Sequence, residues 1–287
     1  MQLVVNGLTL GAIYALVALG LLLIFGAARV VNFAQGQMLM LGAYLGLASM
    51  VDAAMPPWLA YPVTLLAMGA VGLVVMAVAY LPLRGRPAYL VILTTIALGI
   101  VLENLALIVW GSLPVSVPSP VEGRPWRVAG AVVTQHQAFT IATTGVLLFA
   151  LSLFLTRTRF GVLMQATSQD LTMARLVGIR VNRTIAAAFA LGSALAGVAG
   201  LLVAPLFLAE PTMGGSLGLK GFVVSVLGGF GSLPGAVLGG LALGLIETFG
   251  ARYVSSDFRD AYAFLILIGI LCVRPQGLFG EKAGERV

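Results

Sequence analysis

The sequence has one cysteine and one histidine, which is too few for most sites that depend on these side chains. The single thiol, Cys272, cannot form a disulfide framework or a thiolate metal cluster within one chain. No Cys/His pair, helical His-Glu-x-x-His motif or serine-centred nucleophile elbow is present. We therefore expect a chain that is not an enzyme and that holds no metal ion.

Charge is also scarce. Charged residues make up 9% of the sequence and hydrophobic residues 60%, whereas roughly 25% of an ordinary soluble domain is charged. Apolar runs of about 18 or more residues recur along the chain, which predicts an all-α polytopic membrane protein in contact with membrane lipid. The first run has no basic residues before it and continues to Phe25, so we expect a membrane span rather than a cleaved signal peptide.

A net charge of +6 does not indicate a nucleic-acid partner, because the basic residues are dispersed between apolar segments without interleaved aromatics. A phosphate-binding loop is missing too. The glycine-rich run 228–235 ends at Gly235, which is followed by Ala236 and Val237 instead of the Lys and Ser or Thr that contact phosphate and magnesium. If ATP drives this protein, another chain must hydrolyse it.

Nine hydrophobic segments organise the chain into a single transmembrane domain spanning 1–287. The segments are 3–25, 38–50, 59–83, 88–110, 138–155, 185–208, 217–230, 236–249 and 261–273. Segments 217–230 and 236–249 are short enough to be half-helices or a re-entrant hairpin, so the prediction is eight or nine spans. The glycine-containing breaks at 32–36 and 228–235 indicate a weak two-fold internal repeat, unless these glycines only allow close helix packing.

The distribution of basic residues predicts which side of the membrane each loop faces. Eleven of the sixteen Lys and Arg fall on one side, namely Arg29, Arg84, Arg86, Arg157, Arg159, Arg175, Arg180, Arg183, Arg274, Lys282 and Arg286. The positive-inside rule makes that side cytoplasmic. The N-terminus and the proline-rich loop at about 111–137 then lie outside, whereas the loop at about 156–184 and the C-terminus lie inside. Lys220 fits neither side clearly.

The loop at about 156–184 carries a helix of its own, which we expect at 166–177. Thr167 and Ser168 are candidate N-caps, Asp170 lies in the first turn, and Gly178 is a natural stop. The apolar face is small and contains no aromatic residue, unlike the broad face of a helix that lies on a membrane. A modest apolar surface surrounded by charge is more typical of docking onto a partner protein.

Polar residues inside the apolar segments are candidates for a substrate pathway. They are Asn32, Gln35, Gly36, Thr94, Thr95, Glu103 and Asn104. An ionisable side chain in hydrocarbon is costly and usually faces a cavity or a partner, which makes Glu103 the most specific of them. The alternatives are that Glu103 and Glu247 form hydrogen bonds inside the bundle or lie close enough to an interface to be solvated, and that Thr94 and Thr95 bond to their own helix.

The sequence resembles the LivH-type permeases of branched-chain amino acid ATP-binding-cassette importers over nearly its whole length. The matching residues are 7–25 with Gly11-Ala12-Ile13-Tyr14-Ala15-Leu16, then Asn32-Phe33-Ala34-Gln35-Gly36, Gly42-Ala43-Tyr44, Asp170 to Ile179, Gly192 to Gly200, and Arg274-Pro275-Gln276-Gly277-Leu278-Phe279-Gly280. The sequence departs from the family pattern at 164–169, which is more polar than the alanine-rich segment found there.

This resemblance implies a non-catalytic subunit of a bacterial inner-membrane importer that works by alternating access. Its expected partners are a second, LivM-type permease, two cytoplasmic ATPases that bind ATP and magnesium, and a periplasmic or extracellular substrate-binding protein. Whether the permease pair is a heterodimer or a homodimer stays open. So does the substrate, which in related permeases is a branched-chain amino acid, another amino acid, or urea or a short amide.

The resemblance also assigns the coupling to the ATPases to one segment of the loop. The implied residues are Asp170, Ala174, Arg175, Gly178 and Ile179. A competing hypothesis is a secondary transporter or a channel for a small polar solute. Such a protein would use an intramembrane carboxylate as its coupling-ion site, and Glu103 is the best candidate.

Overall fold

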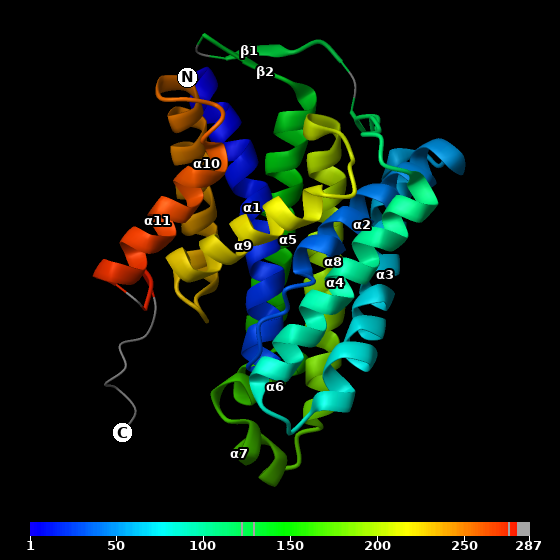
Figure 1. Ribbon diagram of the computed structural model, residues 1–287, viewed down its shortest axis with the longest axis vertical. Helices are drawn as coiled ribbons and strands as arrows, with labels where there is room; N and C mark the ends of the chain where they lie inside the picture. Colours follow the sequence, from blue (N-terminus) through cyan, green and yellow to red (C-terminus); the bar gives the residue numbers. More distant parts are fainter. Residues whose placement is uncertain (122, 129, 275, 280–287) are drawn as a thin grey trace.

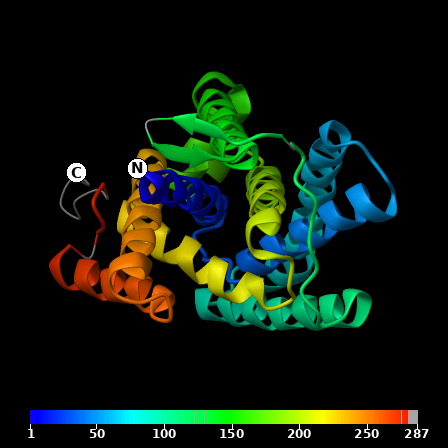
Figure 2. The same ribbon diagram turned by 90° about the horizontal axis from the view of Figure 1, so that it is seen from above.

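The computed structural model describes residues 1–121, 123–128, 130–274 and 276–279. The chain forms a helical bundle with one small hairpin (Figures 1 and 2). The helices are α1 (Gln2–Ala28), α2 (Gln35–Leu47), α3 (Pro57–Val75), α4 (Ala88–Trp110), α5 (Gln135–Arg157), α6 (Arg159–Gln169), α7 (Leu171–Leu176), α8 (Val181–Phe207), α9 (Met213–Gly228), α10 (Leu233–Tyr253) and α11 (Arg259–Val273). A π-helical turn (Ala48–Asp52) extends α2, whereas a π-helical turn and a 3₁₀ turn (Met76–Leu83) extend α3.

Each of the nine hydrophobic segments corresponds to a helix in the part of the chain that the structure describes. The all-α polytopic class is therefore confirmed. Six of the described helices are long and apolar enough to cross a membrane, namely α1, α3 with its extension, α4, α5, α8 and α10. α9 is apolar but shorter.

Several helix boundaries follow from local sequence signals. α3 starts with Pro57 at its first position, where the missing N–H costs nothing. Thr134 begins α5 with a capping box, in which its hydroxyl accepts from Gln137 N (3.2 Å) and the Gln137 side chain accepts from Thr134 N (3.0 Å). α4 ends at Gly111, whose φ of 83° lies in the region that favours glycine.

The centre of the bundle is formed by α1 and α8, whose side chains are mostly buried. The most extensive helix contacts join α1 to α10 and α3 to α8. α2 packs mainly against α8, and α9 packs against α1, α2 and α10. Glycines allow this close packing: a Cβ placed on Gly42 would collide with the backbone of Gly197. The core is therefore built from backbone-to-backbone contacts between helices that are far apart in the sequence.

Two helices of the bundle are oblique continuations of the central ones. α1 ends before Arg29, a non-glycine residue at φ 56°, and the chain turns through 30–34 before α2 runs obliquely away (Figure 1). α8 ends before Leu208, which also has a positive φ (66°), and α9 also runs obliquely. Positive φ is uncommon for residues with a Cβ, so both breaks are held by the surrounding packing.

The two ends of the bundle differ. The N-terminus lies at one end beside the hairpin of β1 (Trp126–Val128) and β2 (Ala131–Val133), and α6 and α7 lie at the other (Figure 1). The hairpin was not predicted from the sequence, since its strands have three residues each. Val115 and Ala209 exchange backbone hydrogen bonds of 2.9 and 2.8 Å, which joins the proline-rich loop to the α8–α9 link.

Candidate functional site

The α6–α7 segment is the site that the sequence predicted as a docking surface, but its helical structure differs from the prediction. The single helix expected at 166–177 is wrong, because α6 runs to Gln169 and α7 starts at Leu171. The expected caps Thr167 and Ser168 lie inside α6, where the Thr167 hydroxyl donates to Leu163 O (2.8 Å). The cap of α6 is Thr158, whose hydroxyl accepts from Gly161 N (3.0 Å).

Asp170 separates the two helices and caps the second. Its backbone is extended, and its carboxylate accepts hydrogen bonds from Thr172 N (2.7 Å) and Met173 N (3.0 Å). A carboxylate at this position satisfies N–H groups that would otherwise have no partner and favours the positive end of the helix. The bonds from Met173 and Thr172 lower the pKa of Asp170. Asp170 is therefore a helix cap rather than a residue of the first turn.

The end of α7 agrees with the sequence prediction. Gly178 has φ 84°, its N–H donates to Arg175 O (3.1 Å), and Ile179 N donates to Ala174 O (2.9 Å). These two bonds form a Schellman motif, in which a left-handed glycine lets the chain satisfy the last carbonyls of a helix. The motif turns the chain back towards α8, so α7 is held at both of its ends.

α7 presents an apolar surface to solvent. Ala174 is buried, whereas Met173, Leu176 and Val177 are 60, 74 and 76% exposed. Arg175 is exposed beside them. Exposed apolar side chains that cluster in this way at the tip of a molecule are typical of an interaction surface.

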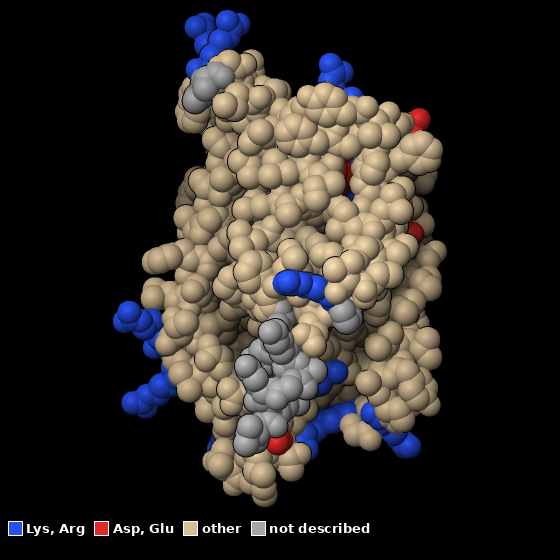
Figure 3. All heavy atoms as spheres, turned by 90° about the vertical axis from the view of Figure 1, so that its left-hand side faces the viewer, with Lys and Arg blue, Asp and Glu red and all other residues tan. Residues whose placement is uncertain are grey.

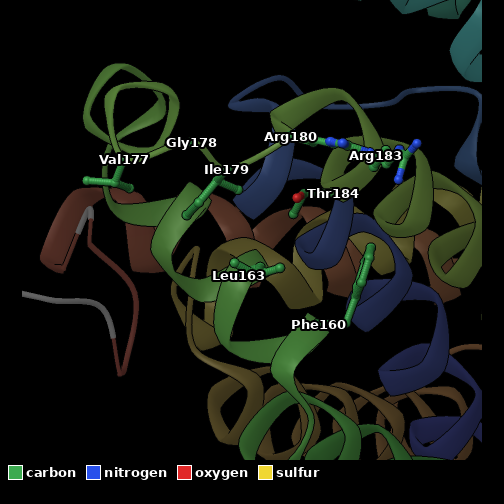
Figure 4. Close-up of a pocket in the computed structure, with 8 residues that line it drawn as sticks. All are labelled: Phe160, Leu163, Val177, Gly178, Ile179, Arg180, Arg183 and Thr184. Carbon is green, nitrogen blue, oxygen red and sulfur yellow. The ribbon is translucent and has the colours of Figure 1, made fainter.

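A groove of about 430 Å³ lies between α6 and the start of α8 (Figure 4). Phe160 and Leu163 line it from α6, Val177, Gly178 and Ile179 from the turn after α7, and Arg180, Arg183 and Thr184 from the link and the first turn of α8. The groove is therefore apolar on the α6 side, and two guanidinium groups lie on the α8 side. Of the predicted coupling residues, Gly178 and Ile179 line it directly.

The break between α1 and α2 gathers three of the predicted pathway residues. Asn32 and Thr95 hold the start of α2, since Asn32 Oδ1 accepts from Ala34 N (3.1 Å) and Thr95 Oγ1 accepts from Phe33 N (3.2 Å). Gln35 Nε2 donates to Gly192 O of α8 (2.9 Å). We call Asn32, Gln35 and Thr95 the central polar cluster.

The central polar cluster is buried but not saturated with hydrogen bonds. Asn32 Nδ2 and Gln35 Oε1 have no partner among the described residues, and neither does Oε1 of the neighbouring Gln37. Gly36 is packed so tightly against Gly214 of α9 that any side chain there would collide. Buried donors and acceptors without hydrogen bonds are costly at the centre of a membrane bundle. Polar side chains that keep such atoms there are typical of functional positions.

The other pathway candidates lie on α4 and do not join this cluster. Thr94 and Asn104 donate to backbone carbonyls one turn earlier, at Leu90 O and Ile100 O (both 2.8 Å), as is common for such residues in membrane helices. Glu103 is half-buried about two turns beyond Thr95, and its carboxylate has no hydrogen bond or ion pair within the described chain.

An ionic cluster around a buried Lys220–Glu247 pair was not predicted. Lys220 Nζ of α9 lies 2.9 Å from Glu247 Oε1 of α10 and 2.9 Å from Asp260 Oδ1 of α11. Tyr14 of α1 donates to Glu247 Oε2 (2.8 Å), and Arg259 Nε lies 3.6 Å from Glu247 Oε1. Lys220 and Glu247 were visible in the sequence as ionisable residues in apolar segments, but nothing local showed that they pair. Glu247 is thus hydrogen-bonded inside the bundle, which was the predicted alternative to a role in the substrate pathway.

The whole chain is similar to known membrane permeases. Residues 3–273 match the family model described as branched-chain amino acid transport system / permease component. The chain is 35% identical to the high-affinity branched-chain amino acid transport system permease protein BraD of Pseudomonas aeruginosa, over 100% of this chain and 98% of BraD. It is 36% identical to LivH of Escherichia coli K12, with 100% and 97% covered.

One more distant sequence match and one solved structure complete the comparison. The autoinducer 2 import system permease protein LsrC of Enterobacter sp. is 29% identical, over 92% of this chain and 78% of LsrC. A solved structure titled PsaBC from Streptococcus pneumoniae in complex with Fab matches with a TM-score of 0.53 and 12% identity, over 96% of this chain and 93% of that one. With full-length identity above 30% to BraD and LivH and a family model matching nearly every residue, the chain belongs to the family of permease components of branched-chain amino acid transport systems.

Proposed function

We propose that this chain is the membrane-embedded permease subunit of an ATP-binding-cassette importer for branched-chain amino acids. The printed names of BraD and LivH describe branched-chain amino acid transport, and the autoinducer 2 permease is less similar. The observation that carries the coupling role is the α6–α7 segment, which exposes Met173, Leu176 and Val177 in a chain without a phosphate-binding loop. Two separate ATPases then bind ATP and magnesium.

In this proposal the α6–α7 end faces the cytoplasm of a bacterial inner membrane, and the N-terminus faces outward. The positive-inside rule supports this orientation, since Arg29 and Arg84 both contact the α6–α8 region, at Ser168 and at Asn182 Oδ1 (2.5 Å). In Figure 3 the Lys and Arg side chains lie mainly over the lower half of the face, and in the upper half they are confined to the top edge. Lys282 and Arg286 lie outside the described residues.

We also propose eight or nine spans arranged as two related halves. α1, from the first half, packs on α10 from the second half, and α8, from the second half, packs on α3 from the first. An inverted repeat would produce such reciprocal packing, and α2 and α9 would then be its two equivalent oblique helices. A LivM-type permease is the expected second subunit. The substrate-binding protein would be received at the outer end, where Val115 and Ala209 join the proline-rich loop to the α8–α9 link.

The substrate pathway would run past the central polar cluster and Glu103. The spare polar atoms of Asn32 and Gln35 support this placement, because a passing solute could satisfy them. Gly36, Thr94 and Asn104 are weaker members, given their packing and local hydrogen bonds. Alternating access would follow from movements of the α6–α7 segment that reach this cluster.

The coupling role can be tested with Leu176→Asp. Leu176 is 74% exposed, so a charge there should leave the fold intact but disrupt an apolar contact with an ATPase. We expect co-purification of the ATPases to fall at least tenfold. Leu113→Asp is the matched control, because Leu113 is 77% exposed at the opposite end and should retain the ATPases.

Normal ATPase association in Leu176→Asp would contradict the docking role of α7. A bulky residue at Gly178, whose φ of 84° disfavours any side chain, should give the same loss by distorting the turn. Reconstitution of the chain alone distinguishes the competing hypothesis. Uptake driven by an ion gradient without any ATPase would show a secondary transporter or channel.

A further inference from the structure

Arg29 contacts the end of α6, and docking of the apolar α7 surface onto an ATPase does not require this contact. It follows the last residue of α1, and its backbone N–H donates to Phe25 O (2.8 Å). Its φ of 56° is unusual for a residue with a side chain. From this position its guanidinium Nη2 donates to the carbonyls of Ser168 and Gln169, the second at 3.4 Å. The side chain thus joins two segments that lie 139 residues apart in the sequence.

The two carbonyls are at the C-terminal end of α6. The last carbonyls of a helix have no partner within the helix and carry partial negative charge, so a guanidinium there is stabilising. Only Asp170 separates this end from α7. Arg29 therefore fastens the middle of the α6–α7 segment to the end of α1.

On its other side, Arg29 is close in sequence to the central polar cluster. The chain from Val30 to Ala34 is short, and Val30, Asn32 and Ala34 are all buried. A short buried link has little freedom to absorb a displacement at one of its ends. Movement of Arg29 is therefore passed on to Asn32 and to the start of α2.

Space beside the contact allows such a movement. A cavity of about 980 Å³ is lined by Arg29 and by Gln165, Ser168 and Gln169 of α6, and it extends to the α9–α10 link. The end of α6 is therefore not wedged in place by other helices on this side. Arg29 is the described side chain that bonds the end of α6 to α1 across this space.

We propose that Arg29 is a positioning residue for transport, which joins the C-terminal end of α6 to the α1–α2 break so that both move together. This inference rests on the proposed function, since it needs ATPases that move the α6–α7 segment. An arginine suits the role because its Nη2 carries two N–H donors on a planar group that stays charged, so this one atom can donate to both carbonyls.

The test uses the complete transporter, with its partner permease, ATPases and binding protein, in proteoliposomes that take up radiolabelled leucine. In Arg29→Ala we expect ATP hydrolysis within about twofold of wild type and uptake per ATP at least tenfold lower. Arg29→Lys should be intermediate. Arg86→Ala is the control, because Arg86 is exposed in the same set of basic residues and has no side-chain hydrogen bond within the described chain.

A designed disulfide tests the same idea independently. A Cβ at Gly26 would lie 3.8 Å from Cβ of Ser168, within the usual Cβ–Cβ range of about 3.5–4.5 Å for a disulfide. Gly26→Cys with Ser168→Cys, in a Cys272→Ala background, should therefore fasten α6 to α1 without Arg29. We expect oxidation to restore uptake per ATP to Arg29→Ala at least fivefold, and reduction to abolish the gain.

Unchanged uptake per ATP in Arg29→Ala would overturn the inference and leave the proposed function intact. Loss of uptake when the disulfide forms in the protein that retains Arg29 would also overturn it, because α6 and α1 would then have to separate during transport. That second experiment decides the matter if Arg29→Ala fails to assemble. Wild-type uptake that needs no ATPase would instead refute the proposed function.

Discussion

The buried Lys220–Glu247 pair should be essential to the stability of the bundle, and Glu247→Gln tests this. The Glu247 side chain is 1% exposed and is bonded to Lys220 and Tyr14. Removing one partner of a buried ion pair costs about 3–5 kcal/mol, because the remaining charge is left without compensation. Lys220 would retain its ion pair with Asp260, and the glutamine would still accept a hydrogen bond from Tyr14. We therefore expect the free energy of unfolding to fall by about 3 kcal/mol, the lower end of this range.

A double-mutant cycle separates the pair from its surroundings. Lys220→Met leaves Glu247 with Tyr14 and a longer contact to Arg259 of 3.6 Å, so this change should also cost about 3 kcal/mol. The double variant removes both charges and should be less destabilised than the sum by about 2 kcal/mol. The free energy of unfolding is measured by titration with sodium dodecyl sulfate in mixed micelles.

Arg252→Met is the control for this cycle, since Arg252 is exposed near the end of α10 and has no ion pair within the described chain. It should change stability by less than about 0.5 kcal/mol. If the effects of the two single variants are strictly additive, or if both are as stable as the control, Lys220 and Glu247 are each solvated by water or other groups and do not stabilise each other.

Two further predictions concern local hydrogen bonds. The lowered pKa of Asp170 means that its cap stabilises α7 above the unfolded-state pKa of about 3.9 and is lost as pH falls through the lower folded-state value. Exchange of the Thr172 and Met173 amides, measured by mass spectrometry, should thus be slow at pH 5 and faster in Asp170→Ala at the same pH; equal exchange would refute the cap. Thr95→Val removes the acceptor of Phe33 N (3.2 Å), which should cost about 1–3 kcal/mol of unfolding free energy and lower uptake. Thr94→Val, which loses only a bond to its own helix, is its control and should change little.

Much of the fold could be predicted from composition and local signals. The segment 88–110 was expected as a helix and is one, because Pro87 and Gly111 delimit an uninterrupted apolar run. The stop at Gly178 followed from glycine's access to positive φ. Predictions failed where local signals competed. Thr167, Ser168 and Asp170 are all good N-cap residues, and Asp170, whose carboxylate accepts two N–H groups, is the one that caps a helix.

The candidate site was only partly predictable. The polar residues Asn32, Gln35 and Thr95 were visible as exceptions in apolar sequence, yet Thr95 reaches the others from a different helix. Neighbouring Thr94 has the same chemistry but bonds only to its own turn, because it points to another side of α4. Residue type alone could not separate the two threonines.

The membrane class and the positions of the apolar helices follow from hydropathy, and the absence of a phosphate-binding loop motif can also be read from the residues alone. Which polar residues meet depends on the packing of the helices. Tyr14 and Glu247 are 233 positions apart, and Arg29 and Ser168 are 139 apart. Such contacts depend on how the helices pack, which here is set by glycine-mediated backbone contacts such as that of Gly42 with Gly197, and no local pattern encodes that arrangement.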